Sequence, residues 1–221
     1  MSGSNKKNKG KTLVTLLLDR SGSMQSVKDD TIGAINAYLA TLRASGEDIR
    51  FSLVMFDSEF GGGMDLQKFC VAKKVGEVAD LMPYDFMPRG HTPLIDATCT
   101  TIQAVAGALG KRKDTKVVMA IQTDGAENAS REFSWNGLKS LISEKEAEGW
   151  EFNFMGCGID AYAQGARMGI SREKTIAYGK NRLATHAAFT ETARNTVLYS
   201  SGAVASVGYT SAQKQSAGDA S

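Results

Sequence analysis

The sequence predicts an α/β fold: a doubly wound, mostly parallel central sheet, flanked by helices on both faces, with one antiparallel edge strand. Apolar runs rich in β-branched residues alternate with segments of helical period, which is the pattern of successive β–α units. The runs at 12–18 and 115–123 are almost continuously apolar, as central parallel strands covered on both faces should be. A chain of 221 residues with 42% apolar content is long enough for one domain with a substantial core.

Strands are expected at the apolar runs that are bounded by turn residues. The expected strands span 12–18, 49–56, 115–123 and 151–157, with a lysine-bearing edge strand at 65–72 and a last edge strand at 174–178. Because three consecutive glycines at 61–63 lead into the edge strand, we expect it to pair with the preceding strand as a hairpin.

Helices are expected where apolar residues recur every three or four positions. These segments are 32–42, 95–109, 138–142, 161–168 and 183–198. Ser26 and Asp29 stand three residues apart before the first helix, where we expect them to form a capping box. Gly46, Gly110 and Gly149 follow the first three helices, as glycine commonly does at a helix end.

The two ends of the chain have a different composition from the rest. Residues 1–10 are expected to be a disordered basic tail and residues 206–221 a flexible tail, which leaves 11–205 as the folded domain. An RNA-associated role for the basic tail is one reading, but the tail lacks aromatic residues that stack on bases. The net charge of only +2 provides no large basic field, so no nucleic-acid partner is expected.

Cysteine usage and hydropathy indicate a cytoplasmic protein. The three cysteines form no C-x-x-C pair, so they are expected to be small buried residues in a reducing compartment. No apolar signal segment precedes the first strand, and no window reaches the roughly 18 apolar residues of a membrane span.

Polar side chains follow two of the apolar runs and open one helix. Asp19, Ser21 and Ser23 follow the first run in D-R-S-G-S-M, and Asp124 follows 115–123 in T-D-G-A-E-N. Thr92, in G-H-T-P-L, precedes a helix. In a doubly wound sheet the carboxyl ends of neighbouring central strands form the ligand crevice, so we expect these oxygens to gather there. Carboxylate and hydroxyl oxygens suit a hard divalent cation.

These motifs resemble the von Willebrand factor A (VWA) domain and its metal-ion-dependent adhesion site (MIDAS). The shared features are D-x-S-x-S after an apolar strand, T-P-L opening a helix about seventy residues later, and D-G after another apolar strand. The resemblance covers roughly residues 11–200 and implies a Rossmann-like VWA fold. The chain shows no secretion signal, and in this respect it is similar to intracellular bacterial or phage members of the family.

The same resemblance implies a metal site and its ligands. Ser21, Ser23 and Thr92 are the implied hydroxyl ligands, while Asp19 and Asp124 are the implied carboxylates that hold Mg²⁺ or Mn²⁺ directly or through water. Five ligands leave one octahedral position open. We therefore expect an interaction module rather than an enzyme, with a protein partner that supplies an acidic side chain. The oligomeric state is not predicted.

An enzymatic reading is the main alternative. A metal-dependent phosphatase or hydrolase would use the same ion and would need Asp57 or His91 as general base. The chain contains neither G-x-x-x-x-G-K-[ST] nor G-x-G-x-x-G after a strand, and it has no G-x-S-x-G elbow, so nucleotide-binding and serine-hydrolase readings have no support.

The site residues also have structural alternatives. Asp19, Ser21 and Ser23 can cap the following helix. Asp57 lines the ligand crevice or belongs to a solvated turn, and His91 contacts a partner beside the metal or faces solvent. Asp96, one helical turn after Thr92, is expected either to hydrogen-bond a ligand loop or a water on the ion, or to be an exposed carboxylate at a helix start.

Overall fold

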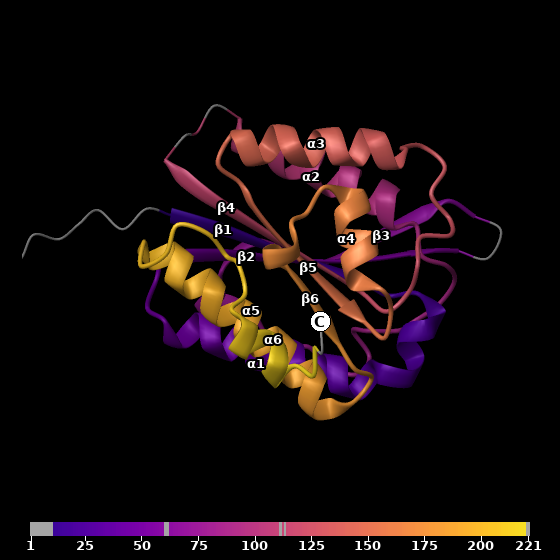
Figure 1. Cartoon of the computed structure of the whole chain (residues 1–221), viewed down its shortest axis with the longest axis horizontal. Coiled ribbons are helices and arrows are strands. Elements are labelled where there is room, and N and C mark those ends of the chain that lie inside the picture. Colours follow the sequence, from indigo (N-terminus) through magenta and orange to yellow (C-terminus); the bar gives the residue numbers. More distant parts are fainter. Residues whose placement is uncertain (1–10, 60–61, 111, 113, 220–221) are drawn as a thin grey trace, which may run out of the picture.

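The computed structural model describes residues 11–59, 62–110, 112 and 114–219, and it contains one six-stranded sheet covered by helices (Figure 1). The strand order is β3-β2-β1-β4-β5-β6. The strands are β1 (Lys11–Asp19), β2 (Ile49–Ser58), β3 (Met64–Lys74), β4 (Thr115–Thr123), β5 (Glu151–Cys157) and β6 (Thr175–Tyr178). The expected basic tail at 1–10 lies outside the described residues.

The sheet is parallel except at one edge. β1 pairs in parallel with β2 and β4, and β5 and β6 continue the parallel order beyond β4. β3 pairs antiparallel with β2, which confirms both the predicted hairpin and the predicted doubly wound sheet. In the register of β1 and β4, Leu18 lies opposite Gln122, so the two strands end side by side. The loops after these strands are thereby brought together.

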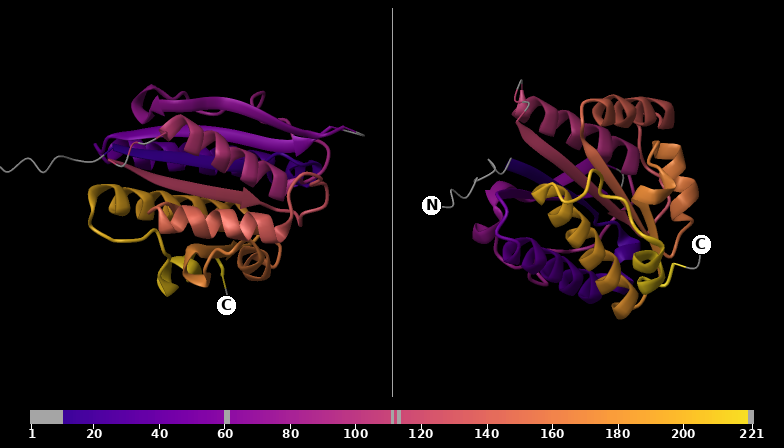
Figure 2. Two further views of the ribbon diagram at one scale, coloured as in Figure 1. Left: turned by 90° about the horizontal axis from the view of Figure 1, so that it is seen from above. Right: turned by 60° about the vertical axis from the view of Figure 1, so that its left-hand side comes forward.

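Helices cover both faces of the sheet. They are α1 (Lys28–Ala44), α2 (Leu94–Leu109), α3 (Trp135–Ala147), α4 (Ala161–Met168), α5 (Arg182–Ser201) and α6 (Ser211–Ser216). α1, α5 and α6 lie on one face, whereas α2, α3 and α4 lie on the other (Figures 1 and 2). Successive residues of β1 point to opposite faces, so Leu16 and Leu18 join the core beneath α1 and α5, while Leu17 joins the core beneath α2 and α3.

The start of α1 differs from the expectation. Within the described part of the chain, Ser26 and Asp29 do not form a capping box, because a 3-10 turn at Gly22–Val27 precedes the helix and Val27 takes the N-cap position. Since the chain is already wound there, the Ser26 hydroxyl donates to the Ser23 carbonyl, three residues back, at 3.1 Å.

Residues 206–219 form a packed segment beside β6, where the composition predicts a flexible tail. Val207 and Tyr209 are buried, and α6 packs against α5. Asp219 Oδ2 accepts the Ala177 N–H at 3.1 Å, so the segment supplies a hydrogen-bond partner to the exposed edge of β6. A few well-spaced apolar side chains thus outweigh a Ser- and Gly-rich composition.

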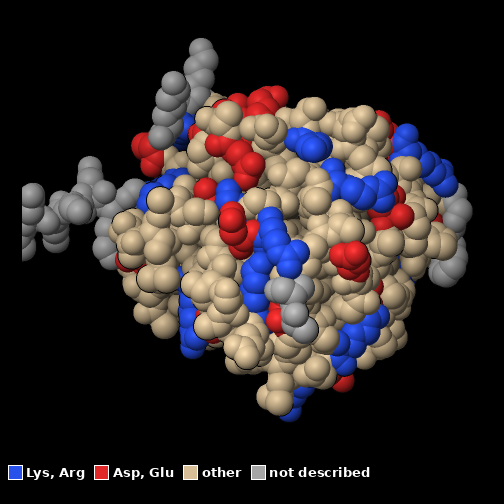
Figure 3. All heavy atoms as spheres, in the orientation of Figure 1, with Lys and Arg blue, Asp and Glu red and all other residues tan. Residues whose placement is uncertain are grey.

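Surface and core follow the composition. Positive and negative groups intermingle on the face shown in Figure 3, in keeping with a net charge of +2.

Cys70, Cys99 and Cys157 are buried free thiols. In the described ranges, no helix is both long enough and apolar enough to cross a membrane.

Candidate metal centre

The predicted site residues lie in the loops after β1 and β4 and in the loop before α2. Asp19 closes β1, and its side chain is fully buried. Its Oδ1 accepts the Ser21 backbone N–H at 2.7 Å, and its Oδ2 accepts the Thr123 hydroxyl at 2.5 Å. These hydrogen bonds fix the carboxylate between the loop after β1, which is the first loop of the site, and the end of β4.

Hydroxyl groups join the first loop to Asp124. The Ser21 and Ser23 Oγ atoms are 3.1 Å apart, and the Ser23 hydroxyl donates to Asp124 Oδ1 at 2.5 Å. Ser21 and Asp124 are buried, whereas Ser23 is exposed. Four of the five predicted oxygen residues therefore form one contiguous set that solvent reaches at Ser23.

Thr92 approaches the same set from a third loop. A Cβ atom on Gly125 would lie 3.0 Å from Thr92 Oγ1 and 3.7 Å from Ser23 Oγ. The bare backbone of Gly125 therefore faces a space that hydroxyls of two other loops border. The Thr92 N–H donates to Asn128 Oδ1 at 2.9 Å, and the Asn128 N–H donates to the Thr92 carbonyl at 3.2 Å, which fixes Thr92 to the loop after β4.

The helix-cap alternative does not describe these side chains. Ser21 stands at the N-cap position of the 3-10 turn, but its side chain makes no cap hydrogen bond within the described chain. The hydroxyls of Ser21 and Ser23 are directed at each other and at Asp124 instead. The residues that the sequence places in three separate motifs are thus brought together at one point.

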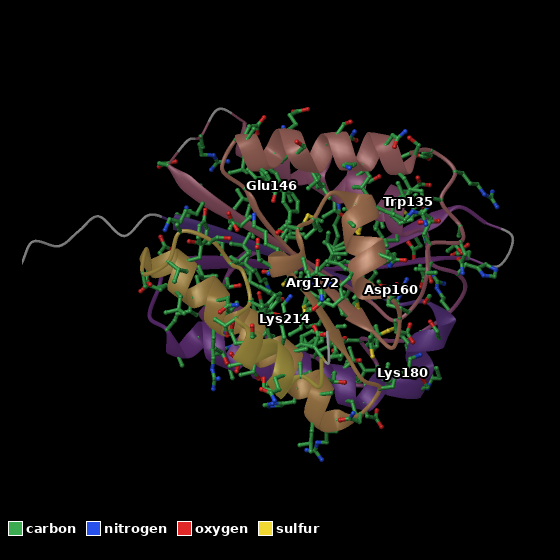
Figure 4. All side chains as sticks on the ribbon, viewed as in Figure 1. Trp135, Glu146, Asp160, Arg172, Lys180 and Lys214 are labelled. Carbon is green, nitrogen blue, oxygen red and sulfur yellow. The ribbon has the colours of Figure 1, made fainter. Side chains whose placement is uncertain are left out.

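A lysine that the sequence analysis did not select also reaches this point. Lys180 follows β6 by two residues, and its Nζ donates to Asp124 Oδ2 at 2.9 Å. The Asp124 side chain is fully buried and that of Lys180 is 41% exposed. The hydrogen bond to Asp124 raises the pKa of the Lys180 ammonium group, which is therefore charged at neutral pH. Figure 4 labels Lys180 where β6 leads into α5.

Burial changes the acidity of Asp19. Loss of solvation raises the pKa of the Asp19 carboxyl group to about 7, against the opposing effect of the hydrogen bonds from Thr123 and Ser21. The charge of Asp124 adds a smaller upward contribution. Because the carboxyl groups of Asp19 and Asp124 are both buried and their negative charges repel each other, their ionised forms would be stabilised by a nearby cation.

Asp57 belongs to an ion-pair cluster beside the first loop. Its Oδ2 accepts Arg20 Nε at 2.7 Å and Arg89 Nε at 3.1 Å. Arg20 Nη2 also bonds Asp65 Oδ2, at 2.8 Å. Arg20 stands between Asp19 and Ser21, so the cluster anchors the backbone of the first loop to β2, β3 and the loop before α2. Asp57 is completely buried rather than part of a solvated turn.

Asp96 and His91 occupy the margin of the site. The carboxylate of Asp96 accepts backbone N–H groups of Arg131, Glu132 and Phe133, so it holds the loop after β4 against the start of α2. This is the loop-supporting alternative predicted for Asp96. His91 has an exposed side chain, and its backbone N–H donates to Ser58 Oγ at 3.1 Å.

Glu127 supports the same loop and was not predicted. Its Oε2 accepts the Ile95 N–H at 2.8 Å, and its Oε1 accepts the N–H groups of Ala129 and Ser130 at 2.8 and 2.7 Å. Thr123 and Glu127 flank Asp124 in the sequence, so their proximity to the site could have been anticipated. Lys180 gave no such signal, because it lies 56 residues beyond Asp124 and two strands further along the sheet.

The donor chemistry fits a hard divalent cation. Every polar side-chain atom of the five predicted residues is an oxygen, because two residues carry carboxylates and three carry hydroxyls, and Mg²⁺ and Mn²⁺ prefer such ligands. Among the described residues, no group of three or more His, Cys, Asp and Glu side chains is placed to hold a metal. A cation at this site would therefore depend on the neutral hydroxyls as well as on the carboxylates.

Solved structures share this architecture. Proximal thread matrix protein 1 from the mussel byssus, with a zinc-occupied MIDAS motif, has a TM-score of 0.59 and 14% identity over 86% of this chain and 48% of that one. A von Willebrand factor type A structure from Catenulispora acidiphila has a TM-score of 0.59 and 14% identity over 87% of this chain and 43% of that one. Manganese-loaded TRAP protein from Plasmodium vivax has a TM-score of 0.57 and 16% identity over 82% of this chain and 74% of that one.

These likenesses are structural, since no protein-family model and no curated protein sequence matches the chain. The chain spans less than half the length of the first two of these structures. Identities of 14% to 16% show a shared fold and nothing finer. The structural likenesses, together with the strand order and the antiparallel β2–β3 edge pair, establish that the chain has the von Willebrand factor A fold.

Proposed function

We propose that this chain is a divalent-metal-binding interaction module. In this proposal Asp19, Ser21, Ser23, Thr92 and Asp124 hold Mg²⁺ or Mn²⁺, and a carboxylate of a protein partner completes the coordination. One observation carries the proposal: oxygens of three loops meet, with Ser23 Oγ 2.5 Å from Asp124 Oδ1 and both Ser23 and Thr92 bordering the bare backbone of Gly125.

The donor set supports capture of an anion. Hydroxyl ligands transfer little charge, so the ion supplies Lewis acidity toward a sixth oxygen ligand. Ser23 is exposed, so an incoming group reaches this side of the site from solvent. The zinc and manganese named for two of the similar structures support divalent-metal use by analogy. The near-neutral net charge supports a protein partner rather than nucleic acid. The three buried free cysteines support a cytoplasmic setting.

Hydrolysis at the same ion has weaker support. It requires a general base beside the ion, for which Asp57 or His91 would have to serve. Asp57 Oδ2 is already engaged by the guanidinium groups of Arg20 and Arg89. Protonating Asp57 would remove the charge that pairs with these two guanidinium groups and would weaken the cluster that anchors the first loop. We therefore propose binding, and not turnover, as the function.

Metal titration tests the ion site. The full chain, stripped with EDTA and dialysed, is titrated with Mn²⁺ and with Mg²⁺ by calorimetry, alongside Asp124→Asn, which keeps the side-chain size. We expect one site per chain in the wild type. In the variant we expect the affinity for either ion to fall by about a hundred-fold or more, because one of two carboxylate ligands is lost. Circular dichroism confirms that both proteins are folded. Equal binding in the two proteins would refute the site.

A simple carboxylate tests the open position. Acetate is added to the Mn²⁺-loaded chain while water-proton relaxation reports the exchangeable water on the bound ion. We expect acetate to lower the relaxation enhancement in a saturable way, because it displaces water from the ion. An enhancement that acetate leaves unchanged, with Mn²⁺ still bound, would contradict carboxylate capture while leaving the ion site intact.

A further inference from the structure

Lys180 places a fixed positive charge beside the candidate ion site. Its Nζ contacts Asp124 Oδ2 at 2.9 Å, while the other oxygen, Oδ1, accepts the Ser23 hydroxyl. The lysine thus holds the carboxylate oxygen that Ser23 does not contact. An ion among the five predicted oxygens and the Lys180 ammonium group would therefore share a single buried carboxylate.

The lysine is held by its surroundings rather than by the ion pair alone. A Cβ atom on Gly158 would lie 2.8 Å from Lys180 Cε and 3.1 Å from its Cγ, so the aliphatic stem lies along the bare backbone of Gly158. Gly158 has a φ of +65°, a conformation that L side chains rarely adopt. The path of the stem thus depends on glycine at this position.

The backbone on both sides of the lysine is also fixed. The Gly158 N–H donates to the carbonyl of Tyr178, the last residue of β6, at 2.9 Å. Asn181 is the N-cap of α5, and its Oδ1 accepts the Ala184 N–H at 3.0 Å. Lys180 therefore stands between a strand end and a capped helix start, which leaves its backbone little freedom.

We propose that Lys180 is a specificity-determining residue that weakens cation binding and makes the loaded site select anionic groups. The inference rests on the proposed function above. With Asp19 and Asp124 ionised, a divalent ion brings the site to neutrality, and Lys180 adds one positive charge. Part of the charge of Asp124 is already compensated by the ammonium group, so the ion is held less tightly and attracts a carboxylate more strongly.

The proposal predicts two effects of opposite sign in Lys180→Met, which keeps a similar stem without the charge. Mn²⁺ affinity rises about ten-fold, because the ion no longer shares Asp124 with an ammonium group. Acetate affinity for the Mn²⁺-loaded protein falls about ten-fold, because the loaded site has lost its excess charge. A purely structural lysine would not raise one affinity while lowering the other.

The metal-free protein gives an independent readout. Without metal, Lys180→Met leaves the buried Asp124 without its ammonium partner, so we expect the melting temperature to fall by about 3–6 °C. Saturating Mn²⁺ should restore more of the melting temperature in the variant than it adds to the wild type, because tighter binding stabilises more at equal metal concentration.

The experiment combines both titrations with two matched variants. Lys180→Arg keeps the charge and should retain wild-type-like ion and acetate affinities within about three-fold. Lys139→Met removes an equal charge from the exposed surface of α3 and should change neither affinity. Wild-type binding of Mn²⁺ with unchanged or jointly lowered affinities in Lys180→Met would overturn this inference alone. Failure of the wild type to bind Mn²⁺ would overturn the proposed function and this inference with it.

Discussion

Gly125 shows that the site depends on a missing side chain as much as on its oxygens. Its hypothetical Cβ atom would press against Thr92 Oγ1 at 3.0 Å, closer than ordinary van der Waals contact. Its backbone does not need glycine, since its φ lies outside the positive region. We therefore expect Gly125→Ala to fold normally but to lower Mn²⁺ affinity by roughly ten-fold or more, because a methyl group would enter the ligand space.

A substitution at a second glycine distinguishes loss of ligand space from a general effect of replacing glycine by alanine. Gly107 lies on the exposed side of α2, and no atom of the described residues lies within 4 Å of its hypothetical Cβ position. Gly107→Ala should therefore stabilise the helix by about 0.5–1 kcal/mol without changing Mn²⁺ affinity. Calorimetric titration and urea unfolding of both variants make the comparison. Wild-type affinity in Gly125→Ala would mean that the space beside Thr92 does not belong to an ion site.

Individual residues of the candidate site differ in how well the sequence predicts their positions. Asp19, Ser21 and Ser23 lie within five residues, and strand adjacency brings Asp124 to them, so local motifs and one topological rule were enough to predict that these four residues lie together. Lys180 depends on β6 lying two strands from β4 and on the bare backbone of Gly158. Side-chain paths of this kind arise from tertiary packing, which no local pattern encodes.

Between elements, the ion-pair cluster of Arg20, Asp57, Asp65 and Arg89 joins the ends of β1, β2 and β3 to the loop before α2. Arg20 and Asp57 have side chains that are 7% and 0% exposed, whereas Asp65 is 40% exposed. Buried and exposed members of the same cluster should therefore respond differently to substitution, because solvent screens the exposed pair.

Asp57→Ala should lower the free energy of unfolding by about 3–5 kcal/mol, because it leaves the buried guanidinium group of Arg20 without its only fully buried carboxylate partner among the described residues. Asp65→Ala should cost about 1 kcal/mol or less. Asp80→Ala, which removes the exposed partner of Arg43, serves as the surface control and should change little. Urea unfolding measures all three, and equal losses for Asp57→Ala and Asp80→Ala would rule out the anchoring role of Asp57.

Elements also differ in how well the sequence predicted them. The central strands and the β2–β3 hairpin were predicted because continuous apolar runs and a glycine turn are strong signals. The capping box failed because Ser26 already lies within the turn that follows the first loop. Loop geometry around the site, and not the S-x-x-D pattern, determined where α1 begins.

At the scale of the whole molecule, the segment 206–219 completes the fold at the β6 edge. Val207 is fully buried, Tyr209 is 6% exposed, and the Tyr209 hydroxyl lies 2.8 Å from Thr192 Oγ1 of α5. The Asn153 side-chain amide, on β5, donates to the Val207 carbonyl at 3.1 Å. The segment thus contributes to the core between α5 and the sheet, although its composition resembles that of a tail.

Deleting residues 206–221 should therefore destabilise the protein rather than trim it. Burying a large apolar side chain contributes about 1.5–3 kcal/mol, so loss of Val207 and Tyr209 alone should lower the free energy of unfolding by about 3–6 kcal/mol. Val204→Ala, at a side chain 39% exposed just before the segment, should change it by less than about 0.5 kcal/mol. Urea unfolding followed by circular dichroism decides the matter, since a truncated chain with an unchanged midpoint would make 206–221 the dispensable tail that its composition predicts.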